Sequence, residues 1–257
     1  MNEITTNEGI EILEKKPIFE HLKEFKKRLI YSIIAIIAGF VISYNYSEEI
    51  YKFLIKPLAE NSNREDSKMI YTSLTEAFTT YLKLSIFTGF IMAFPVIAYQ
   101  IYAFISPGLY KKEKKFILPV LIFCPLMFFL GAAFVYYFLF PTAWDFFMSF
   151  ETTKEQTGLP IKLEARVADY LSLVMSLIIA FGISFQLPII LVLLCKFGIL
   201  TSDYLKKHRK YVLVLILIIA GILTPPDIFS QIALSIPLYF LYEISIIIGQ
   251  KIEKKHA

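Results

Sequence analysis

Apolar residues in this chain gather into long runs that polar segments separate. The runs cover residues 29–44, 78–105, 116–140, 170–194, 211–223 and 228–248. A helix rises about 1.5 Å per residue and the hydrocarbon core of a bilayer is about 30 Å thick, so about twenty apolar residues cross it. Strands of a transmembrane barrel would alternate at every second residue, and these runs do not. The pattern predicts an all-α fold, a polytopic membrane protein with six transmembrane helices.

The fifth run is unusually short, and the turn that follows it is polar. Its thirteen residues extend only about 20 Å as a helix. In the sequence "LTPPDIFSQ", Thr224 fits a helix N-cap and Asp227 fits the first turn of the sixth helix. Asp227 and Gln231 are four residues apart and share a helix face, so a partner helix with a polar residue would hydrogen-bond there. The alternative is a well-capped turn at the outer surface.

Composition and charge agree with a membrane protein and give it an orientation. Hydrophobic residues make up 56% of the 257 residues and charged residues 19%, whereas soluble domains carry about 25% charged residues. Lys and Arg number eighteen in the N-terminal tail, the second and fourth loops and the C-terminus, against seven in the first and third loops. Because cytoplasmic loops are enriched in Lys and Arg, both termini are expected in the cytoplasm. The net charge of +4 then reflects topology, and no nucleic-acid partner is expected.

We expect one transmembrane domain over residues 1–257. Residues 1–28 form a cytoplasmic tail with an amphipathic helix, and residues 45–77 and 141–169 form outer loops. The short helices five and six lie within residues 211–248. The three histidines are far apart in cytoplasmic segments, and no catalytic or phosphate-binding motif occurs. We therefore expect no enzymatic activity, no catalytic residue, no metal and no cofactor.

Two acidic residues stand out in the basic cytoplasmic segments. In "IFEHLKEFKKRL", Glu20, Glu24 and Arg28 recur four apart, which permits ion pairing along a helix. In "FISPGLYKKEKKF", Glu113 is surrounded by four lysines. Glu24 and Glu113 are suited to hold a cationic group such as a guanidinium, which pairs well with carboxylates. The alternative is an interfacial amphipathic helix and a solvated glutamate.

Long stretches in the same order as in a known family cover nearly the whole chain: "EHLKEFKKRL", "FPVIAYQIYAFISPGLYKKEKKF", "ADYLSLVMSLIIAFGISFQLPI" and "LTPPDIFSQIALSIPLYFLYEIS". They resemble the TatC subunit of the twin-arginine protein translocase. The resemblance implies a receptor for twin-arginine signal peptides in the cytoplasmic (inner) membrane of a prokaryote. It further implies assembly with itself and with single-span subunits of the TatA and TatB type. Folded proteins would then be exported at the expense of the protonmotive force.

The resemblance also assigns roles to individual residues. Those implied in signal-peptide binding are Glu24, Arg28, Phe104 and Glu113, with Lys26 where the family commonly has Arg. Others are Pro57 in the first outer loop, and Thr224, Asp227 and Gln231 for docking of a partner helix. Gln186 takes the place of an intramembrane Glu that is common in the family.

Gln186 also bears on a competing function, a secondary transporter or channel for small solutes. Such a pathway needs a cluster of polar residues at the bilayer midplane, and Gln186 supplies only one such group. An amide in hydrocarbon needs a hydrogen-bond partner, so Gln186 is expected to face the bundle interior or a partner helix. It is either part of the transport mechanism or a tie between helices.

Overall fold

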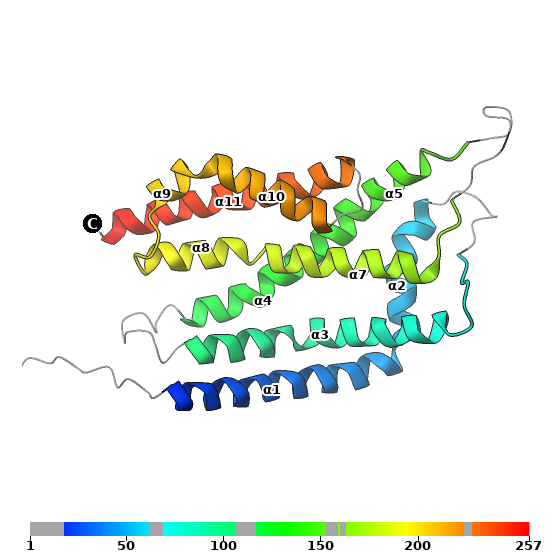
Figure 1. The fold of residues 1–257 in the computed structure, drawn as a ribbon, viewed down its shortest axis with the longest axis horizontal. Coiled ribbons are helices and arrows are strands. Elements are labelled where there is room, and N and C mark those ends of the chain that lie inside the picture. The colour runs from blue at the N-terminus through cyan, green and yellow to red at the C-terminus, as the bar shows by residue number, and fades with distance from the viewer. Residues whose placement is uncertain are drawn as a thin grey trace, which may run out of the picture.

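The structure is a computed structural model, and it describes residues 18–61, 69–105, 117–152, 159, 163–223 and 228–256. Helices account for most of these residues, and Ile70 and Arg166, from the two predicted outer loops, form a parallel β-bridge. Long helices follow one another along a common axis in alternating directions (Figure 1). Their bounds are α1 Ile18–Asn45, α2 Ser47–Asn61, α3 Glu76–Ile105, α4 Ile117–Phe134, the π-helix η3 Val135–Leu139, α5 Phe140–Met148, α7 Val167–Ser184, α8 Leu187–Lys196, α9 Ser202–Lys207, α10 Arg209–Leu223 and α11 Ile228–His256.

The described helices make this a multi-pass membrane protein. Four helical stretches are long and apolar enough to span a bilayer, and the bent pair α1 and α2 adds a fifth. The helix α10 is only 15 residues long, about 22 Å. The predicted short fifth helix is thus present and falls below the length of an ordinary span. With it, each of the six predicted segments is mainly helical within the described residues.

Several boundaries differ from those predicted by hydrophobicity. The first helix begins at Ile18 and continues unbroken to Asn45, so the segment 18–28, where an amphipathic helix was predicted, runs directly into the first apolar run. The first predicted outer loop contains α2, which bends away from α1 by 80°. The third run continues through η3 to Met148, and the sixth continues to His256. Hydrophobicity predicts only the apolar part of a helix, whereas backbone hydrogen bonds can continue the helix into more polar sequence.

The first two long helices pack closely because two glycines meet where they cross. A Cβ atom on Gly39 would lie 2.7 Å from the carbonyl oxygen of Gly89, and one on Gly89 would lie 2.5 Å from the backbone nitrogen of Phe40. Small residues let membrane helices approach at backbone distance, which strengthens van der Waals packing where lipid offers no hydrophobic driving force. The opposite face of α1 is lined by exposed apolar side chains such as Ile34, Ile37 and Val41, as expected of a surface in lipid.

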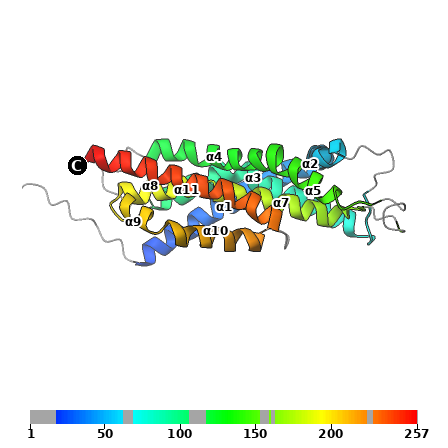
Figure 2. The same ribbon diagram turned by 90° about the horizontal axis from the view of Figure 1, so that it is seen from above.

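The two ends of the bundle differ in composition. The basic end contains the start of α1, α9 and the end of α11, which lie together at one end in both views (Figures 1 and 2). The capped end contains α2, α5 and the start of α7 (Figure 1). Its interior holds a cluster of buried aromatic side chains, in which Trp144 stacks on Tyr170 with ring centroids 5.0 Å apart.

Candidate functional site

The basic end carries a charged pocket between α1 and α3. Its volume is about 510 Å³, and it is open on one side. Both acidic and basic side chains line it, together with an amide and two phenols. The lining residues are Glu20, Lys23, Glu24, Lys27, Arg28, Tyr31, Tyr99 and Gln100. Glu24 and Arg28, which the sequence singled out, therefore share one pocket.

Arg28 holds Glu24 in place within this pocket. Its Nε and Nη2 atoms both donate to Glu24 Oε1, at 3.1 Å and 2.6 Å. Its Nη1 donates to Gln100 Oε1 of α3 at 3.4 Å. The predicted pairing four residues apart on one helix is confirmed. The side chains of Arg28 and Glu24 remain 24% and 20% exposed, so solvent screens the pair, and its net contribution to stability is about 0.2–1 kcal/mol.

Phe104 lies next to this pocket, against the start of α1. Its ring stacks on His21 with centroids 4.4 Å apart, and Phe25 meets it edge-on at 5.5 Å. The structure therefore brings Glu24, Arg28 and Phe104 together at the basic end. Lys26 is exposed on α1. Glu113 lies outside the described residues.

Gln100 is a pocket residue that the sequence reasoning missed. It joins the two helices of the pocket because its amide oxygen accepts from Arg28. The available signal was its position: it is a polar residue in an apolar run, four residues before Phe104 and thus on the same helix face.

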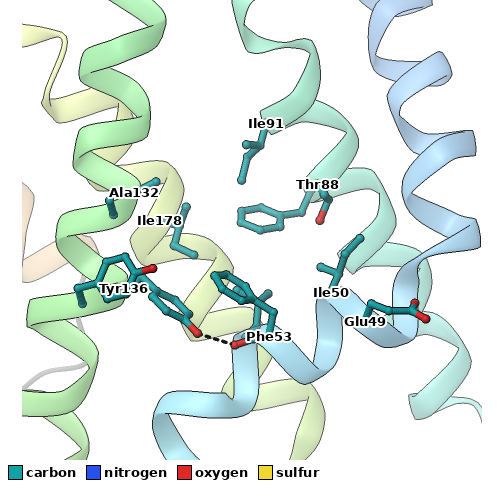
Figure 3. A pocket seen from close by; sticks show the side chains of 12 residues that line it. Glu49, Ile50, Phe53, Thr88, Ile91, Ala132, Tyr136 and Ile178 are labelled. Carbon is teal, nitrogen blue, oxygen red and sulfur yellow. Dashed lines mark hydrogen bonds between the residues drawn. The ribbon is translucent and has the colours of Figure 1, made fainter.

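At the capped end, Pro57 has a specific structural consequence. It lies inside α2, and because proline has no N–H, the carbonyl of Phe53 loses its helical partner. The hydroxyl of Tyr136 donates to that carbonyl at 2.8 Å, as Figure 3 shows, and the two rings stack at 4.4 Å. The next carbonyl, that of Leu54, accepts from the hydroxyl of Tyr170 at 2.8 Å. Two buried tyrosines thus fix α2 over the bundle.

The helix α2 lines one side of an open apolar cavity of about 470 Å³ (Figure 3). The walls come from α3, α4, η3 and α7 as well as α2. The aromatic pair of Phe53 and Tyr136 lies at its edge (Figure 3). Through the freed carbonyl of Phe53, Pro57 therefore helps to determine how α2 is held at the capped end.

Gln186 is 8% exposed and lies in the bundle interior, one of the two environments that the sequence predicted. Here the predicted fourth helix breaks, because α7 ends at Ser184 and α8 begins at Leu187. The side-chain amide donates to the carbonyls of Cys124 at 3.0 Å and Gly182 at 3.3 Å, and the thiol of Cys124 donates to its oxygen at 2.8 Å. The amide is thus engaged in a tie to α4, and no hydrated solute pathway is needed to accommodate it.

Gln231 joins the two helices of the C-terminal hairpin. Its side-chain nitrogen donates to the carbonyl of Leu217 in α10 at 2.9 Å. The group that was assigned to a partner helix therefore also stabilises the chain's own hairpin. Thr224 and Asp227, with the predicted N-cap, lie outside the described residues.

Comparison with known proteins identifies the family. The family model described as Sec-independent protein translocase protein (TatC) matches residues 20–237. The TatC protein of Rickettsia prowazekii is 54% identical over 234 residues, which is 91% of this chain and 92% of that protein. The TatC protein of Escherichia coli K12 is 40% identical over 233 residues, 91% of this chain and 88% of that protein. This chain belongs to the TatC family.

A solved structure agrees in fold as well as in sequence. The crystal structure described as the twin-arginine translocase receptor TatC matches with a TM-score of 0.79 at 37% identity, covering 91% of this chain and 99% of that chain. As a TatC protein, the chain is the core subunit of the Sec-independent, twin-arginine translocase and works with other Tat subunits. The pocket between α1 and α3 lies within the matched residues.

Proposed function

We propose that the chain is the receptor for twin-arginine signal peptides and binds them at the pocket between α1 and α3. The observation that carries the proposal is Glu24, whose carboxylate is oriented by Arg28 inside an open pocket beside Phe104. A planar guanidinium forms strong, directional hydrogen bonds with a carboxylate. A pocket that presents an oriented carboxylate suits an arginine side chain better than it suits an uncharged ligand.

The basic residues around Glu24 give the pocket its selectivity. Lys23 and Lys27 line it and repel a cation from every position except the one next to the carboxylate. Phe104 offers an aromatic ring to the segment that follows the arginines. Glu113, nine residues after Phe104 in the chain, supplies a second carboxylate for the second arginine.

The same proposal covers orientation and partners. The excess of Lys and Arg in the N-terminal tail, the second and fourth loops and the C-terminus supports an orientation with both termini in the cytoplasm of a prokaryotic cell and the protein in its inner membrane. The short helix α10 and the polar hairpin tip with Thr224, Asp227 and Gln231 receive single-span subunits of the TatA and TatB type. The receptor assembles with further copies of itself, and the protonmotive force drives export of folded cargo.

Crosslinking of a photoreactive twin-arginine signal peptide to the membrane-inserted protein tests the binding site. Glu24→Lys and Glu113→Lys should each lower crosslinking at least about tenfold, since a hydrogen bond to a charged group contributes about 1.5–3 kcal/mol. The matched control is Glu48→Lys, which reverses an exposed glutamate on α2 at the capped end and should leave crosslinking unchanged. Equal crosslinking by all three variants and the unaltered protein would rule out this site.

Cysteine labelling tests the orientation separately. Cysteines introduced near Lys112 and Lys207 should react only with reagents that reach the cytoplasm. Cysteines near Arg64 and Lys154 should react from the outside. Cytoplasmic labelling near Lys154 would contradict the six-span topology without bearing on the pocket.

A further inference from the structure

We propose that the outward surface of α9 and the start of α10 binds the headgroup of an anionic phospholipid. We call it the lipid-headgroup surface, and it consists of Tyr204, Lys207, His208, Lys210 and Tyr211. It goes beyond signal-peptide recognition, because it concerns the contact of the receptor with the bilayer around it.

The inner face of α9 is fixed to α11, so its outer face is held in one orientation. The backbone N–H of Ser202 donates to Glu253 Oε1 at 2.7 Å, and its hydroxyl donates to Glu253 Oε2. The hydroxyl of Tyr242 donates to the carbonyl of Leu205 at 2.7 Å. Ser202 and Leu205 are buried, whereas Tyr204 and Lys207 are exposed. A short helix is thus presented as a rigid surface.

The acidic groups near this surface already have cationic or N–H partners. Lys206 binds Asp203 at 3.0 Å, and Arg209 binds Glu243 at 2.7 Å. Lys207 and Lys210 are exposed and have no acidic partner in the part of the chain that the structure describes. Two positive charges therefore remain uncompensated at one place on the basic end of the bundle.

Aromatic rings lie between and beside these two lysines. His208 stacks on Tyr204 with centroids 4.0 Å apart and lies 5.9 Å from Tyr211. The ammonium of Lys210 is 5.1 Å from the centroid of Tyr211. Tyr204 and Tyr211 are more than half exposed. Tyrosines favour the headgroup level of a bilayer, and basic residues there attract anionic lipids. Exposed rings beside free ammonium groups match an amphiphile with an anionic head better than a soluble anion.

The lipid-headgroup surface is distinct from the signal-peptide pocket. Both lie at the basic end, but α9 and α1 are on opposite sides of the bundle in Figure 1. The ammonium groups of Lys207 and Lys210 repel the arginines of a signal peptide. A lipid phosphate is their natural counter-ion at this depth.

Titration of the purified full-length protein with lipid, followed by native mass spectrometry, tests the proposal. Phosphatidylglycerol should bind more tightly than phosphatidylcholine with the same acyl chains. The double variant Lys207→Gln/Lys210→Gln should lose about 30-fold in affinity for phosphatidylglycerol, because each lysine near an anionic surface contributes about fivefold. Its affinity for phosphatidylcholine should not change. Added salt should reduce the difference between the two lipids.

A charge-matched control separates this surface from overall charge. Lys52→Gln/Lys83→Gln removes two exposed lysines elsewhere and should leave phosphatidylglycerol binding unchanged. Equal loss in both double variants, or full binding by Lys207→Gln/Lys210→Gln, would overturn the proposal. Competition by inorganic phosphate at the same concentration as the lipid would also overturn it, because the site would then bind a soluble anion. Crosslinking of the signal peptide reports that the variants are folded.

Discussion

The capped end and the basic end use the same kinds of polar residues in opposite ways. At the capped end Glu76 is buried and accepts from the N–H of Thr72 at 2.8 Å, from Arg166 at 3.3 Å and from the N–H of Ala168 at 3.3 Å. At the basic end the pair of Glu24 and Arg28 stays partly exposed beside an open pocket. Polar groups that are fully bonded internally stabilise an architecture, whereas partly solvated groups remain available to a ligand.

This contrast assigns stability to one end and recognition to the other. Substitutions at the capped end should lower the free energy of unfolding and leave ligand affinity intact. Substitutions at the basic end should do the reverse. The following predictions test this division, starting with the largest expected effect.

Removal of the two tyrosine hydroxyls at the capped end should cause the largest loss of stability. Tyr136→Phe and Tyr170→Phe each remove the donor to a backbone carbonyl of α2, at a cost of about 1–3 kcal/mol apiece. Thermal unfolding of the purified protein, followed with a thiol-reactive dye, measures the loss. Crosslinking of the signal peptide at low temperature should persist.

A double-mutant cycle with Pro57→Ala sharpens this prediction. Alanine restores an N–H that can bond the carbonyl of Phe53 within α2. Tyr136→Phe should therefore cost less stability in the Pro57→Ala background. Tyr170→Phe is the internal control, because it bonds Leu54 and should cost the same in either background. Equal costs of Tyr136→Phe with and without Pro57 would refute the explanation of this proline.

Arg28→Gln should separate binding from stability at the basic end. Its pair with Glu24 is partly exposed, so the loss in stability should stay below about 1 kcal/mol. Affinity for a twin-arginine peptide should fall about tenfold, or about 1.4 kcal/mol, because Glu24 is no longer oriented. Arg166→Gln at the capped end is the matched control and should show the reverse: lower stability and unchanged affinity. If both variants affected the same property, the division between the ends would be wrong.

Gln186 lies between the two ends. Loss of its hydrogen bond to α4 should lower the free energy of unfolding by about 1 kcal/mol, as expected for a hydrogen bond between membrane helices. Gln186→Leu should impair export of a folded twin-arginine reporter while the protein still accumulates in the membrane. Gln186→Glu should retain export, because a protonated carboxyl can still donate to the carbonyl of Cys124. Full export by Gln186→Leu would leave this position with a packing role only.

The smallest effect is expected at Gln231. Gln231→Leu removes one hydrogen bond to α10, worth about 0.6 kcal/mol in a membrane protein. Unfolding should shift slightly, and copurification with a single-span subunit should weaken if that subunit docks at the hairpin. Copurification equal to that of the unaltered protein would assign Gln231 to the hairpin alone.

The sequence by itself determined the features that depend on neighbours along the chain. The apolar runs predicted the helical segments, including the short α10, because hydrocarbon thickness sets the length of a span. The spacing of Glu24 and Arg28 predicted their ion pair, because residues four apart are neighbours on any helix. The order of the long motifs identified the family.

The tertiary structure alone decided which distant residues meet. Tyr136 bonds the carbonyl of Phe53 across 83 positions, and Gln186 bonds that of Cys124 across 62. Neither contact could be predicted from the pattern. In lipid the buried and exposed faces of a helix are equally apolar, so hydrophobicity reveals a span but not its rotation. The rotation follows from packing, as at Gly39 and Gly89, and only the folded bundle fixes it.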